Sequence, residues 1–242
     1  YNAFVEKTVE KFKNGIDNPI VSRTGWNEKS IVDYDTRTMR FNASLHYRIT
    51  EEIEANIRGT YGEGNSVYTA QNRFAFENFN MTTLVGEIKS PDFYIRAYSV
   101  SENSGDTYNA GGVALQINEA WKPSEQWYDD YIGSFTQTFL ISNNEDQAHA
   151  FARLVAENRT PQGTVFNDSA PAFPLADSDR FNHLLDSLKS IPVNEGGGKV
   201  IDKSRMYHVE GLYNFRHLIP WFDLLAGASY RTYRINSEGT VF

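Results

Sequence analysis

The chain has 242 residues, a formal net charge of −8, 14% aromatic residues and no cysteine. The lack of cysteine excludes disulfides, thiolate metal sites and cysteine nucleophiles, and the acidic balance gives no electrostatic case for a nucleic-acid partner. The sequence has no run of about 18 apolar residues and therefore no candidate transmembrane helix.

Residues 1–33 are predicted to form a loop with one short helix. Four apolar residues recur at helical spacing: Phe4, Val5, Val9 and Phe12. Gly15 and Pro19 then break regular structure. The first residues lack the apolar core of a signal peptide, so we expect that a targeting signal has been removed or that the chain starts inside a larger protein.

Residues 36–61 alternate between apolar and polar side chains on both sides of a short break at residues 50–52. The apolar set is Met39, Phe41, Ala43, Leu45, Tyr47, Ile49, Ile53, Ala55, Ile57, Gly59 and Tyr61. Between them lie polar residues that include Arg40, His46, Arg48 and Arg58. A period of two across a tight turn predicts a β-hairpin with one apolar and one polar face.

Four further strands are predicted from the same alternation, at residues 73–89, 93–102, 205–215 and 223–236. In the second of these, Tyr94, Arg96 and Tyr98 oppose an apolar set. Residues 62–72 are small and polar, so the sequence predicts a loop there. Pro91 favours a tight turn at residues 89–92.

Residues 103–203 change character and are predicted to contain four helices. Apolar residues recur at helical spacing in residues 110–121, 124–141, 145–158 and 178–191. Ser124 and Ser178 are expected to start two of these helices. The glycine-rich residues 194–199 are interpreted as a flexible hinge leading back to the strands. The predicted division is therefore 1–33, 34–102, 103–203 and 204–242.

The lengths of the connections decide between possible settings of the sheet. They are short at 50–52, long after Tyr61, short at 89–92, very long after Glu102 and short at 217–220. In an antiparallel meander, this order gathers the tight turns at one rim, as in outer-membrane barrels with short periplasmic turns and long extracellular loops. The strand at 36–49 rises roughly 33 Å at a tilt near 45°, enough for a bilayer. Strands of soluble domains usually have about five or six residues.

The sequence thus predicts an all-β fold: an antiparallel up-and-down transmembrane β-barrel segment of about six strands, with a long, partly helical extracellular loop. Aromatic residues support it, because they gather near the tight turns (Tyr47, Phe93, Tyr94, Phe215, Trp221, Phe222) and toward the other rim (Tyr61, Tyr230, Tyr233). Arginine on the lipid face costs about 2–4 kcal/mol at the midplane, so the arginines are expected in the lumen. The alternative is a soluble β-sandwich with the aromatic residues in its core.

Three stretches resemble the barrel of TonB-dependent outer-membrane receptors, most closely the starch-utilisation-type transporters. They are FYIRAYSVSENSGDTYNAGGVALQINEAWKP, VEGLYNF and LLAGASYRTYRINSEGT. The similarity covers most of the chain from about Asp33, and SENSGDTYN is its most specific part. It implies a 22-strand barrel with an N-terminal plug, which imports nutrients across the outer membrane of a Gram-negative bacterium with energy from TonB.

Neither the plug nor a TonB-contacting segment is visible in the sequence. Because six strands are fewer than the eight of the smallest usual barrel, we expect a fragment of a larger barrel. Asn236, Ser237 and Gly239 interrupt the alternation before Phe242, so this ending is interpreted as a truncation. The resemblance implies three partners: outer-membrane lipid, the TonB system through a plug domain, and a surface-exposed substrate-binding lipoprotein.

No motif predicts catalysis, a metal site or a cofactor. His149, His183 and His208 lack partners at H-E-x-x-H spacing. The carboxylate pairs at 129–130 and 177–179 are explained by helix capping and solvation. The sequence therefore predicts a protein that is not an enzyme.

Two groups of residues are candidates for binding. The first would line the lumen: Arg40, His46, Arg48, Arg58, Tyr94, Arg96 and Tyr98. The second lies on the loop helices: Trp121, Trp127, Tyr128 and Tyr131. These form either a substrate-facing aromatic surface or the core of the loop's own cap. The main hypothesis is a nutrient importer, and the alternative is an outer-membrane scaffold or assembly barrel that does not transport.

Overall fold

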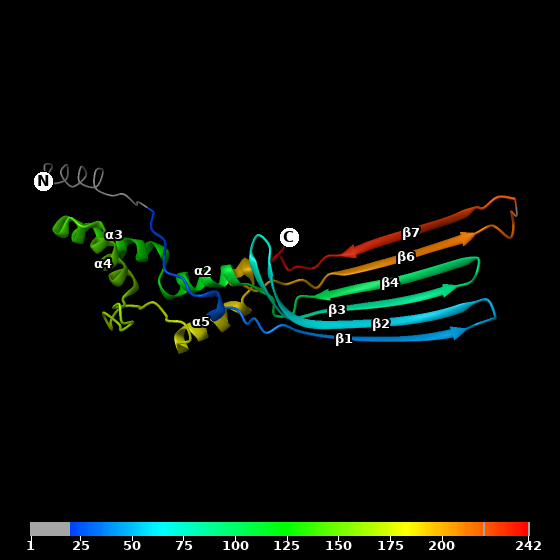
Figure 1. The fold of residues 1–242 in the computed structure, drawn as a ribbon, viewed down its shortest axis with the longest axis horizontal. Coiled ribbons are helices and arrows are strands. Elements are labelled where there is room, and N and C mark those ends of the chain that lie inside the picture. Colours follow the sequence, from blue (N-terminus) through cyan, green and yellow to red (C-terminus); the bar gives the residue numbers. More distant parts are fainter. Residues whose placement is uncertain (1–19, 220, 242) are drawn as a thin grey trace. The chain divides into compact units, whose positions relative to one another are not determined.

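The computed structural model describes residues 20–219 and 221–241, and the chain forms two compact units (Figure 1). The sheet unit comprises Val32–Val113 and the residues from Leu188 onward. The helical unit comprises Ala114–Ser187 and the residues up to Ile31. The helix predicted around Phe4 to Phe12 lies outside the described residues.

The sheet unit is built on an antiparallel sheet that has seven strands within the described residues. Six follow one another in chain order: β1 (Arg37–Arg48), β2 (Glu54–Thr69), β3 (Arg73–Lys89), β4 (Phe93–Asn103), β6 (Arg205–Asn214) and β7 (Leu225–Arg234). The short β5 (Tyr108–Asn109) pairs with β3. The predicted antiparallel meander is confirmed. The sheet is not closed, since β1 and β7 each pair on one side only among the described residues.

Three short connections lie at the same end of the sheet, on the right in Figure 1. They join β1 to β2, β3 to β4 and β6 to β7. Backbone hydrogen bonds close them: Ile49 N–H donates to the Ile53 carbonyl at 2.9 Å, Ser90 to Phe93 at 2.7 Å and Phe215 to Leu224 at 2.8 Å. These turns agree with the sequence prediction.

The loop predicted at residues 62–72 is wrong. β2 continues to Thr69, its residues 66–69 pair with residues 73–76 of β3, and only residues 70–72 connect the two strands. The register shifts between Gly64 and Ser66, and such bulges increase local twist. Glycine and serine conceal the alternation in the sequence, whereas cross-strand packing stabilises it, with the Tyr68 and Phe76 rings 6.4 Å apart.

The predicted alternation gives the sheet an apolar face that continues across six strands. One row in register consists of Leu45, Ile57, Gly86, Ala97, Val209 and Tyr230. Leu45 is 71% exposed, Ile57 65% and Tyr230 67%. Tyr230, which the sequence placed near a rim, therefore lies beside the aliphatic side chains. The whole width of this face is apolar and open to solvent.

The aromatic belt near the short turns is only partly on this apolar face. Tyr47 and Phe93 lie on it, and Phe93 stacks against Tyr213 with ring centroids 6.5 Å apart. Tyr94 lies on the opposite, polar face, where it shares a side with Arg96. Tyr233, toward the other rim, also lies on the polar face and shares a side with Arg231. Strand periodicity places them there, because side chains two residues apart point to the same side.

The helical unit confirms the predicted helices to within one residue: α2 (Ala110–Trp121), α3 (Ser124–Ser142), α4 (Glu145–Glu157) and α5 (Asp179–Ser190). The first and last carry the chain between the units. The Ser178 hydroxyl accepts the Phe181 N–H at 3.3 Å, as an N-cap does. Ser124 is the first residue of α3, but the cap position is Pro123. No helix among the described residues is long and apolar enough to cross a membrane.

The core of the helical unit is an aromatic ladder on α3 packed against an alanine stripe on α4. The ladder consists of Trp127, Tyr131, Phe135 and Phe139, and the stripe of Ala148, Ala152 and Ala156. Residues four apart share one face of a helix. Successive rings are stacked at 5.1, 6.5 and 5.7 Å, and the alanines, which are fully buried, give the rings room.

The flexible hinge predicted at residues 194–199 is wrong. Gly198 N–H donates to the Leu188 carbonyl at 2.9 Å, Lys199 to Ile191 at 2.8 Å, and Asn109 to the Gly198 carbonyl at 2.8 Å. A Cβ on Gly198 would lie 2.1 Å from Val113 Cγ2. Glycine is therefore needed for close packing, and the segment is a tightly bonded turn.

Candidate functional site

The polar face of the sheet carries a row of side chains that pair from strand to strand. In register the row is His46, Asn56, Glu87, Arg96, Glu210 and Ser229. Arg96 Nη2 lies 2.5 Å from Glu87 Oε2, and Arg96 Nη1 lies 3.2 Å from Glu210 Oε1. Each such cross-strand pair stabilises a sheet by about 0.2–1 kcal/mol. Arg96 therefore joins three neighbouring strands.

His208 extends this paired region toward β7. It is 8% exposed, and the Tyr98 ring lies 4.8 Å from its imidazole. Arg231 Nε donates to His208 Nδ1 at 3.2 Å, and His208 Nε2 lies 3.4 Å from Glu210 Oε2. The half of the polar face formed by β3, β4, β6 and β7 is thus largely satisfied by its own side chains.

The other half of the polar face, on β1 and β2, is positively charged. Glu54 binds both His46, at 3.0 Å, and Lys89, at 3.3 Å. Three exposed arginines have no side-chain hydrogen bond or ion pair with any residue that the structure describes: Arg40, Arg48 and Arg58. We call them the arginine strip.

The arginine strip follows the direction of the strands. Arg58 lies opposite Ser44, and Arg40 and Arg48 lie four residues to either side of Ser44. Because a β-strand rises about 3.3 Å per residue, four residues correspond to about 13 Å along the strand. The three cations are therefore spaced along one line of the polar face.

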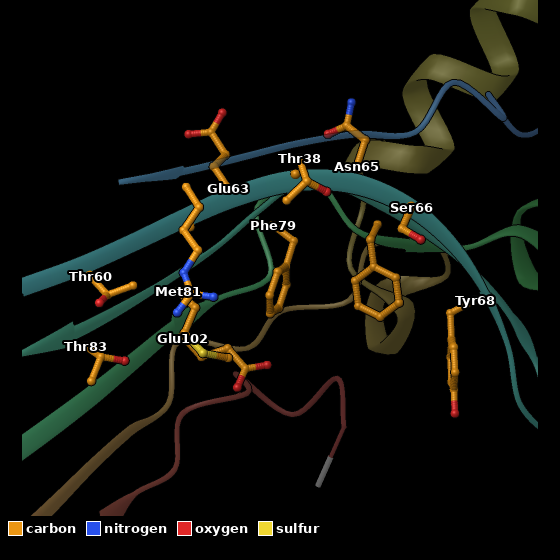
Figure 2. Close-up of a pocket in the computed structure, with 14 residues that line it drawn as sticks. Thr38, Thr60, Glu63, Asn65, Ser66, Tyr68, Phe79, Met81, Thr83 and Glu102 are labelled. Carbon is orange, nitrogen blue, oxygen red and sulfur yellow. The ribbon is translucent and has the colours of Figure 1, made fainter. Parts of the chain in front are cut away.

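A groove of about 700 Å³ opens on the same face, where β2 and β3 bend (Figure 2). Its apolar wall contains Phe79, Phe76, Tyr68 and Met81. The Phe76 and Phe79 rings meet edge to face at 5.6 Å. Figure 2 shows Phe79 and Tyr68 extending to one side of the β2 ribbon, whereas Glu63 and Asn65 extend to the other.

Polar residues complete the lining: Thr38, Arg40, Thr60, Glu63, Asn65, Ser66, Thr83 and Glu102. Its volume is within the range of small-ligand sites, about 300–1,000 Å³. Of the predicted luminal residues, the groove contains Arg40 alone. His46, Arg48, Arg58, Tyr94, Arg96 and Tyr98 share the polar face but lie nearer the short turns.

The aromatic wall of the groove was missed in the sequence because its alternation changes phase. Asn78 adopts a left-handed backbone, with φ of 55°, and its N–H donates to Asn65 Oδ1 at 2.9 Å. Residues 77 and 78 therefore leave the ladder, and Phe76 and Phe79 come to share a side although they are three positions apart, an offset that in a regular strand places side chains on opposite sides. The aromatic run at residues 74–79 was the only signal.

The segment with the most specific family resemblance, residues 101–109, holds the base of the helical insertion. Asn78 Nδ2 donates to Asp106 Oδ2 at 2.9 Å, and Lys199 Nζ lies 3.3 Å from Asp106 Oδ1. Both contacts hold the pKa of the Asp106 carboxyl below its usual value. Lys189 Nζ lies 4.6 Å above the buried Tyr108 ring and 3.2 Å from Glu77. These contacts make the segment a structural clamp.

The predicted aromatic candidates of the loop lie in the core of the helical unit. Trp127 is fully buried, Trp121 is 3% and Tyr131 4% exposed, and Tyr128 packs partly buried against the same cluster. Arg23 lies between Trp121 and Trp127, with Cζ 5.4 and 5.8 Å from the rings, and donates to the Asn118 and Lys122 carbonyls. Of the two alternatives left by the sequence, this burial favours a core over a substrate-facing surface.

Within residues 20–219 and 221–241, no group of three or more acidic or histidine side chains is arranged to hold a metal ion. Comparisons of the chain with protein-family models, curated proteins and solved structures find no match. A function for this chain is therefore inferred from its own side chains and their arrangement.

Proposed function

We propose that the sheet unit is part of the wall of a transmembrane β-barrel in the outer membrane of a Gram-negative bacterium. We further propose that this barrel imports a nutrient in the manner of the TonB-dependent receptors that the sequence resembles. One observation carries the proposal: an apolar face is continuous and exposed across six strands, while the opposite face is charged and largely paired.

The apolar face has an energetic reason to be covered. Burying one Leu or Ile side chain contributes about 1.5–3 kcal/mol, and Leu45, Ile57, Leu84 and Ile95 are all more than half exposed in the sheet. Soluble monomers rarely expose contiguous apolar patches larger than a few hundred Å². Lipid is a suitable cover because the central row of this face, from Leu45 to Tyr230, carries no charged side chain.

The lengths of the connections also support a barrel wall, with the short turns facing the periplasm. The three short turns at one end of the sheet suit the periplasmic rim. The β2–β3 turn at residues 70–72 and the long connection between β4 and β6 start from the other end of the strands, which suits the extracellular rim. Closing a barrel takes at least about eight strands, so the proposal places further strands beside β1 and β7. The helical unit then belongs to two extracellular connections, the segment that precedes β1 and the insertion between β4 and β6.

Import is favoured over a purely scaffolding barrel by the arginine strip and the groove. A wall that only supports other proteins can satisfy its charges internally, as β3, β4, β6 and β7 do. The three guanidinium groups of the arginine strip have no side-chain partner among the described residues and can meet a solute. Rings of such residues are used by pores that pass anions.

The membrane setting is tested by introducing single cysteines into the full-length protein, since residues 1–242 contain no native cysteine. In outer membranes, Leu45→Cys, Ile57→Cys and Leu84→Cys should react with a lipid-soluble maleimide and resist a charged, membrane-impermeant one. Ser44→Cys should show the reverse order, because it lies on the polar face. Ile141→Cys, at an 88% exposed position of α3, is the control for full aqueous access.

A soluble sandwich makes a different prediction for the same variants. Its apolar face packs on another sheet, so cysteines there resist both reagents, and the protein is extracted without detergent. Equal reaction of Ser44→Cys and Leu45→Cys with the charged reagent would also contradict the proposal, because both faces would then meet water.

A further inference from the structure

The groove combines an apolar wall with a cation that has no partner among the described side chains. The Phe79 and Phe76 rings form the wall, and Tyr68, 56% exposed, continues it. A planar ring packs against such side chains edge to face or offset, which contributes about 0.5–1.5 kcal/mol beyond burial. Aromatic rings are therefore one part of a ligand that this groove fits.

Arg40 supplies the second part. Its neighbours in register are Gly62 on β2 and Met81 on β3, neither of which carries charge, and its guanidinium has no bond to another described side chain. Guanidinium groups bind carboxylates through two parallel, charge-assisted hydrogen bonds. An anionic group over β1 and β2 would meet this cation.

Glu102 determines the orientation of such a ligand. It lies in the same register row on β4, three strands from Arg40 and roughly 14 Å away at normal strand spacing. Its carboxylate repels an anion from the β4 side of the groove. The threonine hydroxyls at positions 38, 60 and 83 lie along the groove and accept or donate hydrogen bonds to polar substituents.

We propose that the groove is a binding site for an organic anion that carries a planar ring. The ring packs against Phe76 and Phe79, and the anionic group binds Arg40. Arg58 and then Arg48, each about 13 Å further along the same face, offer the anion successive positions toward the short turns. The succession along the strip rests on the proposed function; binding in the groove does not.

The test uses the purified full-length protein in detergent and three probes measured by calorimetry. 2-Naphthoate carries a ring and a charge, 2-naphthylmethanol a ring alone, and maltohexaose neither. We expect 2-naphthoate to bind most tightly, and Arg40→Gln to weaken it by about ten-fold or more while leaving 2-naphthylmethanol within about two-fold. Phe79→Ala should weaken both ring probes and identify the apolar wall.

Arg216→Gln is the matched control, because it removes an arginine at the opposite end of the sheet, where Arg216 pairs with Asp223. It should leave all three affinities unchanged. Heat-modified migration of each variant on gels verifies that it is folded before binding is measured.

Three results would overturn the proposal. Maltohexaose could bind while 2-naphthoate does not, or Arg40→Gln could weaken the charged and neutral ring probes equally. Arg40→Gln could also leave 2-naphthoate binding intact and instead make the plug easier to digest, which would identify Arg40 as a plug contact. If 2-naphthoate binds as expected but the cysteine-labelling pattern fails, only the membrane setting is refuted. If the labelling pattern holds but 2-naphthoate does not bind, only the groove is refuted.

Discussion

The substitution Ile57→Arg distinguishes a lipid-facing wall from a soluble sheet by its energetic cost. Ile57 lies on β2 between Leu45 and Gly86, in the apolar row that reaches Tyr230, and is 65% exposed. Arginine on the lipid face near the midplane costs about 2–4 kcal/mol. This corresponds to a loss of roughly 30- to 900-fold in the folding equilibrium. At an exposed position of a soluble protein the same change usually costs within about 0.5 kcal/mol.

The assay is urea unfolding of the full-length protein reconstituted in phospholipid vesicles, followed by gel mobility of the folded form. Ser229→Arg is the matched control, since it places the same charge on the polar face next to Glu210. We expect Ser229→Arg to be within about 0.5 kcal/mol of the unsubstituted protein. If the two variants have the same stability, or Ile57→Arg is nearly neutral, the assignment of the apolar face to lipid is refuted.

Two further predictions concern the helical unit, whose unfolding can be followed by fluorescence because it contains Trp26, Trp121 and Trp127 of the four tryptophans. Ala152→Leu should destabilise this unit by about 1–3 kcal/mol, because the larger side chain overpacks against the α3 ladder. Ala150→Leu, on the exposed face of α4, is the control and should not destabilise it. Equal destabilisation by both variants would show that the alanine stripe is not closely packed. Hydrogen bonds from the Ser124 hydroxyl and N–H lower the pKa of the Glu119 carboxyl below its value in the unfolded chain. The ionised carboxylate therefore stabilises the folded state above the unfolded pKa, and this stabilisation is lost as the pH falls through the lowered pKa. Glu119→Gln should therefore flatten the decline in the unfolding midpoint below about pH 4.5, whereas Glu125→Gln, which removes the same charge from an exposed position, should retain it.

Elements with uninterrupted periodicity were predictable from the sequence. The β3 boundaries and all four helices follow from alternation or helical spacing alone, because propensity and pattern agree there. β2 was underestimated, because Gly62, Gly64 and Ser66 have low strand propensity and are held in place by pairing with β3. Local sequence does not reveal such pairing.

The candidate site was less predictable than the fold. Arg40 and Arg96 were placed on the correct face, but only the register shows that Arg96 is paired on both sides while Arg40 is not paired with a described side chain. The groove depends on the left-handed backbone of Asn78, which changes the phase of the aromatic run. Helical spacing of Trp127 and Tyr131 is compatible with both a core and a surface, and burial decides between them.

The bonded turn at Gly198 has a consequence for how the protein can vary. Asn109 and Gly198 are joined by a backbone hydrogen bond, so the chain leaves and re-enters the sheet unit at one closed point. The entropy of closing a flexible loop increases by only about 0.6 kcal/mol for each doubling of its length. Changes in the length of residues 110–197 therefore add little to the entropic cost of closing this point, and we expect the strands on either side to keep their register.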